Sequence, residues 1–505
     1  MPNETMEKDT RTDYDVIIVG AGIAGINGAY RVQTQLPEGT SYAILESRDA
    51  IGGTWDLFKY PGIRSDSDLH TFGFPWRPWK EQRAIADGES IVKYIRESAA
   101  MYGIDQKIKF RHKLLAADWR SELQRWRLSV EHNGEKKTLT SRFLFMGTGY
   151  YDYQEPLEVT IPGLENFKGT IVHPQFWPED LDYTGKKVVV IGSGATAITL
   201  LPSLADKASH VAMLQRSPSY LLSLPSASPV EKLISWILPA AIGTKLLRWR
   251  WLFIGWFFFN FCRAFPRAAR AILRLRTQSM LPKNVPHDPH FVPPYNPWEQ
   301  RMCVCPDADF FDALASGKTS IATGHIKTVT ADGIQLTDPA AQKLNPRITS
   351  GVDIIVTATG LKILLAGGTR LSVDGTPIDA GSKFLWRGLM LQDVPNAAFV
   401  IGYTNASWTL GADATAQLFT RIVNHMAAEG IASCVPTLPP HDAASMEKRP
   451  TLNLNSTYVK KAMDALPMTG DRGPWVARSS YYRDFWNAKF GDFRDGLLFR
   501  RAASA

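Results

Sequence analysis

Two glycine-rich turns in this chain have the spacing that binds the pyrophosphate of a dinucleotide. The first contains Gly20, Gly22 and Gly25, and it follows an apolar run at 14–20 that predicts a buried parallel strand. The first glycine allows a tight turn, the second lets the backbone approach a pyrophosphate, and the third lets the next helix pack close to the strand. Amide groups at the start of that helix would hold the negative charge.

The acidic residue that belongs with such a turn is also present. A second predicted strand at 42–45 ends at Glu46, 21 residues after Gly25. Its carboxylate is placed to accept hydrogen bonds from ribose hydroxyls. Strand, turn, helix and acid in this order predict a complete nucleotide-binding unit.

A second turn of the same kind lies further along the chain. A strand predicted at 187–191 leads into a turn that contains Gly192, Gly194, Ala195, Thr196 and Ala197. The spacing is again that of a dinucleotide turn, with alanine in place of the third glycine.

The residues after the next strand indicate which dinucleotide the second turn prefers. The strand at 210–214 is followed by Gln215, Arg216 and Ser217. Gln215 occupies the position that Glu46 has in the first copy, where a carboxylate would repel a 2′-phosphate and an arginine beside it would attract one. The second turn is therefore predicted to bind NADPH. The alternative is that Arg216 is an ordinary surface arginine.

Two longer patterns accompany the turns. Residues 167–178 read F-K-G-T-I-V-H-P-Q-F-W-P, and the fixed positions of this fingerprint are Phe167, Gly169, His173, Trp177 and Pro178. Residues 52–66 read G-G-T-W-D-L-F-K-Y-P-G-I-R-S-D and end at Asp66. His173 is predicted to be a hydrogen-bonded structural histidine of a linker rather than a proton carrier.

Both patterns are similar to the signatures of type I Baeyer–Villiger monooxygenases, which are class B flavoprotein monooxygenases. The resemblance implies FAD at the first turn and NADPH at the second. It implies that O2 forms a flavin C4a-peroxide, which converts an apolar ketone into an ester or lactone. It also implies cofactor contacts by Gly53, Thr54, Trp55, Asp56, Asp66 and Leu114.

A smaller group within that family resembles this chain more closely. The string at 401–410, I-G-Y-T-N-A-S-W-T-L, together with 295–301, is similar to the ethionamide-activating monooxygenase subgroup, whose members also oxygenate sulfides. The resemblance places Asn405 and Trp408 near the flavin and the substrate. The alternative for Trp408 is an ordinary core tryptophan.

Oxygen insertion beside a carbonyl requires a fixed cation. Attack on a ketone leaves an oxyanion, which a preorganised cation stabilises by a few kcal/mol in a dry site. Arginine suits this task because it does not give up a proton at working pH. The resemblance assigns the task to Arg301, oriented by Asp66; the alternative is a structural ion pair. Gln300 stands where many family members carry a phosphate-binding lysine, so NADPH preference would rest on Arg216 and Ser217.

Three rival functions fit parts of the sequence. A flavin-dependent heteroatom (S/N) monooxygenase would use the same cofactors on sulfides or amines. A disulfide or quinone reductase would have a similar two-nucleotide fold, but the disulfide type needs a redox cysteine pair, and Cys303 and Cys305 are too close for its usual spacing. A membrane-bound, non-catalytic flavin-binding partner would not need Arg301 and Asp66. No metal site is predicted.

The predicted fold class is α/β, with two Rossmann-like dinucleotide-binding domains, the second inserted in the first, and a helical apolar insertion. Similar strings at 143–149 and 354–360 mark the crossings between the two domains. The predicted segments are 1–150 (FAD-binding, N-terminal part), 151–222 (NADP-binding, first part, with the fingerprint linker), 223–296 (helical basic and apolar insertion), 297–358 (NADP-binding, second part) and 359–505 (FAD-binding, C-terminal part).

The net charge of +8 has a local source. Residues 234–276 combine an aromatic run, W-L-F-I-G-W-F-F-F-N-F, with flanking lysines and arginines, and the run is too short to span a bilayer. Peripheral contact with an anionic membrane is one interpretation, and a buried subdomain or a lid over an apolar substrate tunnel is the other.

Composition limits the partners and the compartment. The sequence carries no nucleic-acid motif, so the predicted partners are a small apolar ketone or sulfide and O2. The first ten residues lack an apolar core, so no signal peptide is predicted. Four cysteines without a paired motif favour reduced thiols and a cytoplasmic location. The oligomeric state is not predicted.

Overall fold

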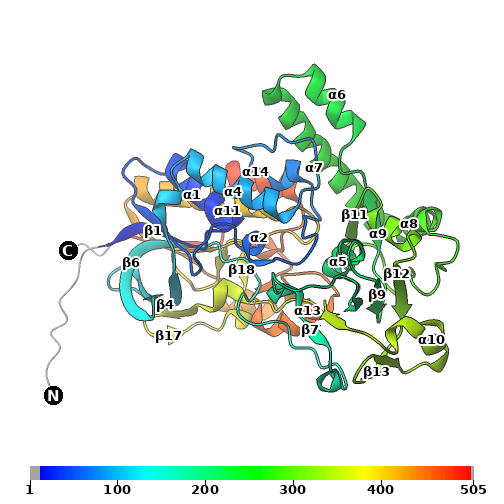
Figure 1. The fold of residues 1–505 in the computed structure, drawn as a ribbon. Coiled ribbons are helices and arrows are strands. Elements are labelled where there is room, and N and C mark those ends of the chain that lie inside the picture. Colours follow the sequence, from blue (N-terminus) through cyan, green and yellow to red (C-terminus); the bar gives the residue numbers. More distant parts are fainter. Residues whose placement is uncertain (1–11, 502–505) are drawn as a thin grey trace, which may run out of the picture.

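Two sheets organise the chain, and each contains one of the strands that lead into a glycine-rich turn (Figure 1). The computed structural model describes residues 12–501. The first ten residues, to which the signal-peptide prediction applies, lie outside the described residues.

The first sheet has nine strands and is mixed, because its middle forms an antiparallel meander. Its strands are β1 (Tyr14–Val19), β2 (Tyr42–Leu45), β3 (Ile108–Lys109), β4 (His112–Arg120), β5 (Arg125–His132), β6 (Glu135–Met146), β16 (Arg370–Val373), β17 (Thr376–Pro377) and β20 (Ala397–Phe399). In β1, Val16 and Ile18 face one core cluster while Ile17 and Val19 face another. Both faces are covered, which is why the strand is an unbroken apolar run.

The second sheet has five parallel strands in the order β12-β9-β8-β15-β7. They are β7 (Thr170–Val172), β8 (Lys187–Ile191), β9 (His210–Gln215), β12 (Thr319–Thr323) and β15 (Ile354–Thr357). All five lie between β6 and β16 in the chain, so the second sheet is inserted in the first. The C-terminal strand β20 then returns to pair with β6. This topology confirms the predicted fold class; the residue boundaries of the five segments stay predictions.

Helices cover both sheets and pack through small residues. The longer ones are α1 (Ile23–Gln35), α4 (Gly88–Met101), α5 (Ala195–Ala205), α11 (Trp408–Ala428) and α14 (Tyr481–Lys489). The shorter ones are α2 (Thr54–Leu57), α3 (Leu69–Phe72), α9 (Asp309–Ala315), α10 (Pro339–Leu344), α12 (Pro440–Ser445) and α13 (Thr457–Ala462). A Cβ on Gly28 of α1 would lie 2.5 Å from the ring of Phe145, so glycine lets α1 lie against β6.

Short ribbons complete the fold. They are β10 (Leu221–Leu224) with β11 (Cys303–Pro306), β13 (Ile326–Val329) with β14 (Ile334–Leu336), β18 (Leu385–Trp386) with β19 (Met390–Leu391), β21 (Ile431–Pro436) with β24 (Leu497–Arg501), and β22 (Arg449–Pro450) with β23 (Met468–Thr469).

The basic, apolar segment folds into three helices that project from the body, as Figure 1 shows. They are α6 (Pro229–Ile237), α7 (Ala240–Ala264) and α8 (Pro266–Met280). Ser228 and Glu231 form a capping box at the start of α6, and prolines precede or open all three helices. Within residues 12–501, no helix is long and apolar enough to cross a membrane.

One half-buried arginine anchors the base of this insertion. Arg248 of α7 donates from Nη1 to the carbonyl oxygens of His70 at 2.8 Å and Gly73 at 2.9 Å, at the C-terminal end of α3. A cation at a helix C-terminus satisfies carbonyls that have no partner within the helix. Nearby, Trp251 Nε1 donates to Glu231 at 2.8 Å, which ties α7 to α6.

Replacing Arg248 should loosen α7 from the body. We expect Arg248→Leu to lower the free energy of unfolding by about 2 kcal/mol, because half-buried carbonyls lose a charged donor. Hydrogen exchange along α7 and α3, with a urea melt, measures the effect. Arg263→Leu, an exposed position of the same helix, is the matched control; equal exchange in both variants would contradict the anchor.

Candidate functional site

The two glycine-rich turns open on one cavity of about 750 Å³. Residues 22–24 of the first turn and 192–196 of the second line it, as do the two crossings at 147, 149 and 358–360. The cavity therefore lies at the junction of the two nucleotide-binding units, where a dinucleotide on each turn would have its reactive end.

Each turn presents an uncapped helix N-terminus to this cavity. α1 begins after Gly22 and α5 after Gly194, and neither helix has a side-chain hydrogen bond at its cap. Their first amide groups are thus free to bind phosphate oxygens, and the helix dipole adds to that attraction. A Cβ on Gly194 would meet no atom within 4 Å, so the cradle is open there. These features fit two dinucleotide pyrophosphates.

The other glycines of the turns serve packing. A Cβ on Gly25 would lie 1.8 Å from the carbonyl oxygen of Gly20, and one on Gly20 would lie 2.7 Å from that of Gly147. In the second turn, a Cβ on Gly192 would lie 2.3 Å from the carbonyl oxygen of Ala358. Each turn therefore contacts a crossing strand backbone to backbone, which holds the crossing beside the cavity.

Most of the predicted site residues line this cavity. Those that do are Gly22, Gly53, Thr54, Trp55, Asp66, Gly192, Gly194, Ala195, Thr196, Arg216, Ser217, Arg301 and Trp408. Those that lie outside its lining are Gly20, Gly25, Glu46, Asp56, Leu114, Ala197, Asn405 and the five fingerprint positions.

Two acidic residues of the first unit have protein partners. Glu46 Oε2 accepts the amide of Ala21 at 2.7 Å, which fixes the turn to the end of β2. Asp56 is buried and forms ion pairs with Arg48 at 2.8 Å and Arg96 at 2.9 Å. Asp56 thereby holds α2 against α4, and its predicted cofactor contact stays a prediction.

The other residues predicted to contact a cofactor, one in the first unit and two in the second, each have their own hydrogen-bond partner. Leu114 is buried in β4, and its carbonyl oxygen accepts from Thr369 Oγ1 at 3.3 Å. Arg216 is exposed, and its Nη2 donates to Thr457 Oγ1 at 3.3 Å across the cavity. The carbonyl of Ser217 accepts from Ser193 Oγ at 2.6 Å, so the segment after β9 is tied to the second turn.

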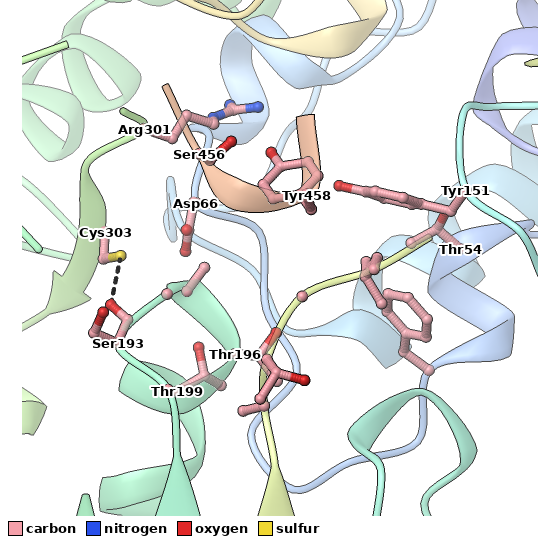
Figure 2. Close-up of a pocket in the computed structure, with 18 of the residues that line it drawn as sticks. Thr54, Asp66, Tyr151, Ser193, Thr196, Thr199, Arg301, Cys303, Ser456 and Tyr458 are labelled. Atoms are coloured by element: carbon pink, nitrogen blue, oxygen red, sulfur yellow. Dashed lines mark hydrogen bonds between the residues drawn. The ribbon is translucent and has the colours of Figure 1, made fainter. Parts of the chain in front are cut away.

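Asp66 and Arg301 reach the same cavity from separate segments, as Figure 2 shows. Within residues 12–501 no ion pair of 4.0 Å or less joins them, although the charge of Arg301 acts on Asp66. Arg301 Nη2 instead lies 3.5 Å from Ser67 Oγ, 234 residues away in sequence. The predicted orientation of Arg301 by Asp66 therefore stays a prediction, and the neighbour of Asp66 supplies the direct contact.

The surroundings of Asp66 shift its ionisation. Burial raises the pKa of the Asp66 carboxyl to about 6, although Arg301 and Arg64 lower it. Arg64 is itself paired with Asp309 of α9, which connects the first unit to the second. Asp66 borders a cavity rather than bulk water, so its charged form is poorly solvated. A perturbed carboxyl between two arginines in a cavity is typical of a functional site.

A group of tyrosines in the cavity was missed by the sequence analysis. Tyr150 and Tyr151 share a hydrogen bond of 2.5 Å between their hydroxyls, and Tyr153 lies 3.0 Å from Thr54 Oγ1. Burial raises the pKa of Tyr150 to about 12, so its hydroxyl stays protonated. The string Y-Y-D-Y directly after the first crossing was the available indication.

Trp408 lies in the wall of the cavity, whereas Asn405 lies outside it. Trp408 opens α11, lines the cavity and stacks on Tyr150 with ring centroids 4.6 Å apart. Asn405 Nδ2 donates to the carbonyl of Ser479 at 3.3 Å, outside the cavity lining. Of the two predicted pocket residues, Trp408 is thus the one at the cavity wall.

The fingerprint residues lie beside the second crossing. Phe167 and Trp177 are buried in the two core clusters on either face of the second sheet. A Cβ on Gly169 would lie 2.3 Å from the carbonyl of Asp353, just before β15. His173 Nδ1 accepts the amide of Gln175 at 3.3 Å, and burial lowers the pKa of its imidazole. These contacts are those of a structural linker, and the site itself lies next to it.

Comparison with known proteins identifies the family. Residues 13–234 match the family described as flavin-binding monooxygenase-like. The chain is 44% identical over 490 residues to the FAD-containing monooxygenase EthA of Mycobacterium tuberculosis, covering 96% of this chain and 98% of EthA. It is 41% identical over 486 residues to the probable FAD-binding monooxygenase AlmA of Acinetobacter baylyi, covering 96% and 95%. The chain belongs to the flavin-binding monooxygenase family.

Solved structures share the fold of this flavin monooxygenase. An oxidized steroid monooxygenase bound to NADP superposes with a TM-score of 0.74 at 20% identity, covering 97% of this chain and 99% of that chain. An open structure of cyclohexanone monooxygenase gives 0.72 at 18% identity, covering 97% and 100%. At these identities the likeness concerns the fold. The flavoprotein monooxygenase family predicted from the two signatures is confirmed.

The poorly solvated carboxyl of Asp66 should make stability depend on pH. Because its pKa is raised to about 6 in the folded protein, the folded state binds the proton more tightly than the unfolded state. Stability is therefore lost as pH rises from about 4 to about 6. We expect Asp66→Asn to stabilise the flavin-free monooxygenase by about 1 kcal/mol more at pH 8 than at pH 5.

Urea unfolding of wild type and variant at the two pH values measures this difference. Asp182→Asn is a suitable control, because the Thr184 amide lowers the pKa of that exposed carboxyl. A stabilisation by Asp66→Asn that is equal at pH 5 and pH 8 would show that the Asp66 charge carries no such cost.

Proposed function

We propose that this monooxygenase holds FAD at the first turn and NADPH at the second, and uses O2 to convert apolar ketones into esters or lactones. The observation that carries the proposal is the single cavity on which both uncapped helix N-termini open, with Arg301 and Asp66 in its wall. Names of relatives support the cofactors: EthA is called FAD-containing, and the steroid monooxygenase structure is bound to NADP.

In this reaction the residues of the protein would bind and orient the cofactors and the substrate, and would stabilise the charge that develops. When bound and reduced, the flavin supplies the activated oxygen. Arg301 is the cation that faces the developing oxyanion, and Ser67 limits the positions of its guanidinium. A charge fixed before the reaction lowers the barrier because it need not reorganise. Asp66, ionised above about pH 6, balances the charge of Arg301 and Arg64.

The cavity wall favours an apolar substrate. Trp408, Tyr150 and Phe72 offer aromatic surface, and the Tyr150 ring is held by stacking on Trp408. Such a wall binds alkyl or ring carbon by burial rather than by hydrogen bonds. It would admit an alkyl or aryl sulfide as readily as a ketone, so sulfoxidation is the alternative reaction of the same site.

The deciding assay is NADPH oxidation by the FAD-loaded monooxygenase with a medium-chain 2-ketone and with an aryl methyl sulfide, followed by mass spectrometry. Ester from the ketone is the expected result. Sulfoxide without any ester would assign the chain to the heteroatom-oxygenating enzymes and remove the proposed role of Arg301.

Arg301→Ala should separate flavin reduction from ketone oxygenation. We expect FAD binding and reduction by NADPH to persist, while ester formation falls on the order of 100-fold to 1000-fold because the oxyanion loses its cation. Stopped-flow absorbance and product analysis measure the two steps, and Arg301→Lys is the conservative control that keeps a charge. Ester formation at the wild-type rate in Arg301→Ala would contradict the assignment.

Arg216→Ala should weaken the binding of NADPH selectively. Arg216 is the cation predicted for the 2′-phosphate, and a charged hydrogen bond contributes about 2 kcal/mol, so we expect the NADPH KM to rise about 10-fold to 30-fold. NADH, which lacks that phosphate, is the internal control, and its KM should change little. A parallel rise for both dinucleotides would place Arg216 away from the 2′-phosphate.

We also propose a cytoplasmic setting for the reaction. All four cysteines carry free, buried thiols. Burial raises the pKa of the Cys262 thiol to about 11, which keeps it in the unreactive protonated form. Free thiols of this kind suit a reducing compartment.

A further inference from the structure

The outer face of α7 is an apolar stripe that the described chain leaves about half exposed. Ile242, Leu246, Trp249, Phe253 and Trp256 recur at intervals of three and four residues, so they share one side of the helix. Their exposed fractions run from 45% for Trp256 to 57% for Phe253. A monomeric protein in water rarely exposes a contiguous row of large aromatic side chains.

The inner face of the same helix is firmly held. Arg248 donates to the carbonyls at the end of α3, Trp251 donates to Glu231, and Phe259 packs edge-on against Trp298 with ring centroids 5.5 Å apart. The insertion therefore has a defined orientation on the body, and the exposed stripe is a consequence of that orientation rather than of loose packing.

The apolar surface continues onto α14. The ring of Trp249 stacks on Tyr482 of α14 with centroids 6.1 Å apart. Trp486 of α14 and Phe490, the residue after that helix, are each 62% exposed. We call this surface, formed by the exposed side chains of α6, α7, α8 and α14, the outer face of the insertion.

The exposed charge of the insertion is basic. Residues 232–287 contain ten lysines and arginines and neither aspartate nor glutamate. Arg263 of α7 is exposed to solvent, and so are four arginines of α8: Arg267, Arg270, Arg274 and Arg276. A row of aromatic side chains next to a cationic flank matches the chemistry of an anionic bilayer surface, where aromatic rings enter the headgroup region and cations pair with lipid phosphates.

We propose that the outer face of the insertion docks on an anionic lipid bilayer, with α7 lying along the surface. A second copy of this chain fits poorly, because it would place the exposed cations of one copy against those of the other. A lid over the cavity does not account for the stripe either, since none of the described residues of α6, α7 and α8 lines that cavity. Docking is independent of the proposed reaction, because it needs no turnover.

Vesicle co-sedimentation with the FAD-loaded full chain tests the docking. Wild type should bind vesicles of phosphatidylglycerol and phosphatidylcholine in equal parts and should bind pure phosphatidylcholine far less. Binding should weaken as salt is raised, because screening reduces the attraction between exposed charges. Absence of binding to the anionic vesicles at low salt would overturn the proposal.

Two double variants locate the docking surface. Phe253→Ser with Trp256→Ser should lower partitioning about 10-fold by removing aromatic contact, and Arg274→Gln with Arg276→Gln should lower it about 10-fold by removing two cations. The matched controls are Leu344→Ser with Met101→Ser, which are exposed apolar positions elsewhere, and Lys136→Gln with Lys137→Gln. The controls should bind like wild type.

Other occupants of the outer face give distinct results. If the controls and the outer-face variants lose binding equally, the attraction is a property of net charge and the proposal fails. Light scattering could instead show a dimer that is absent in the double variant Phe253→Ser with Trp256→Ser. If the wild type then does not bind vesicles, the outer face is a subunit interface. NADPH oxidation of each variant without vesicles checks that the fold and the catalytic site are intact.

Discussion

The structure depends on the meeting of two helix N-termini across one cavity. α1 and α5 start without side-chain caps, so their first amide groups have no partner except what enters the cavity. Glycine at 25 and 192 lets each turn press against neighbouring backbone, where a Cβ has no room. Because the two turns belong to different sheets, the relative placement of the sheets determines the width of the site, and the crossings at 147–149 and 358–360 fix that placement.

The cavity contains charged side chains whose poor solvation lowers stability, and the proposed reaction depends on them. Asp66 is poorly solvated between Arg64 and Arg301, and this poor solvation raises the pKa of its carboxyl to about 6. Arg64 also pairs with Asp309 of the second unit, so the same small group of charges joins the two units. A site at the junction of two units can orient two cofactors relative to each other. Ion pairs between the units are needed because each sheet has its own core.

The helical insertion connects the site to the molecular surface. Its inner face packs Phe258 and Leu273 against Met302, the residue after Arg301. Its outer face carries the exposed aromatic stripe. The segment that presents Arg301 is therefore supported by the same helices that form the proposed docking surface, so a movement of these helices would also displace residues next to the site.

The sequence by itself determined the two turns, the strands before them, the family and part of the cavity lining, because spacing along the chain encodes local backbone geometry. It did not determine the contact of Arg301 with Ser67, the ion pairs of Asp56 or the tyrosines at 150, 151 and 153. It also left open which face of α7 would be exposed. These features depend on side chains that meet from distant segments, and only the packing of the two sheets and the insertion decides which segments meet.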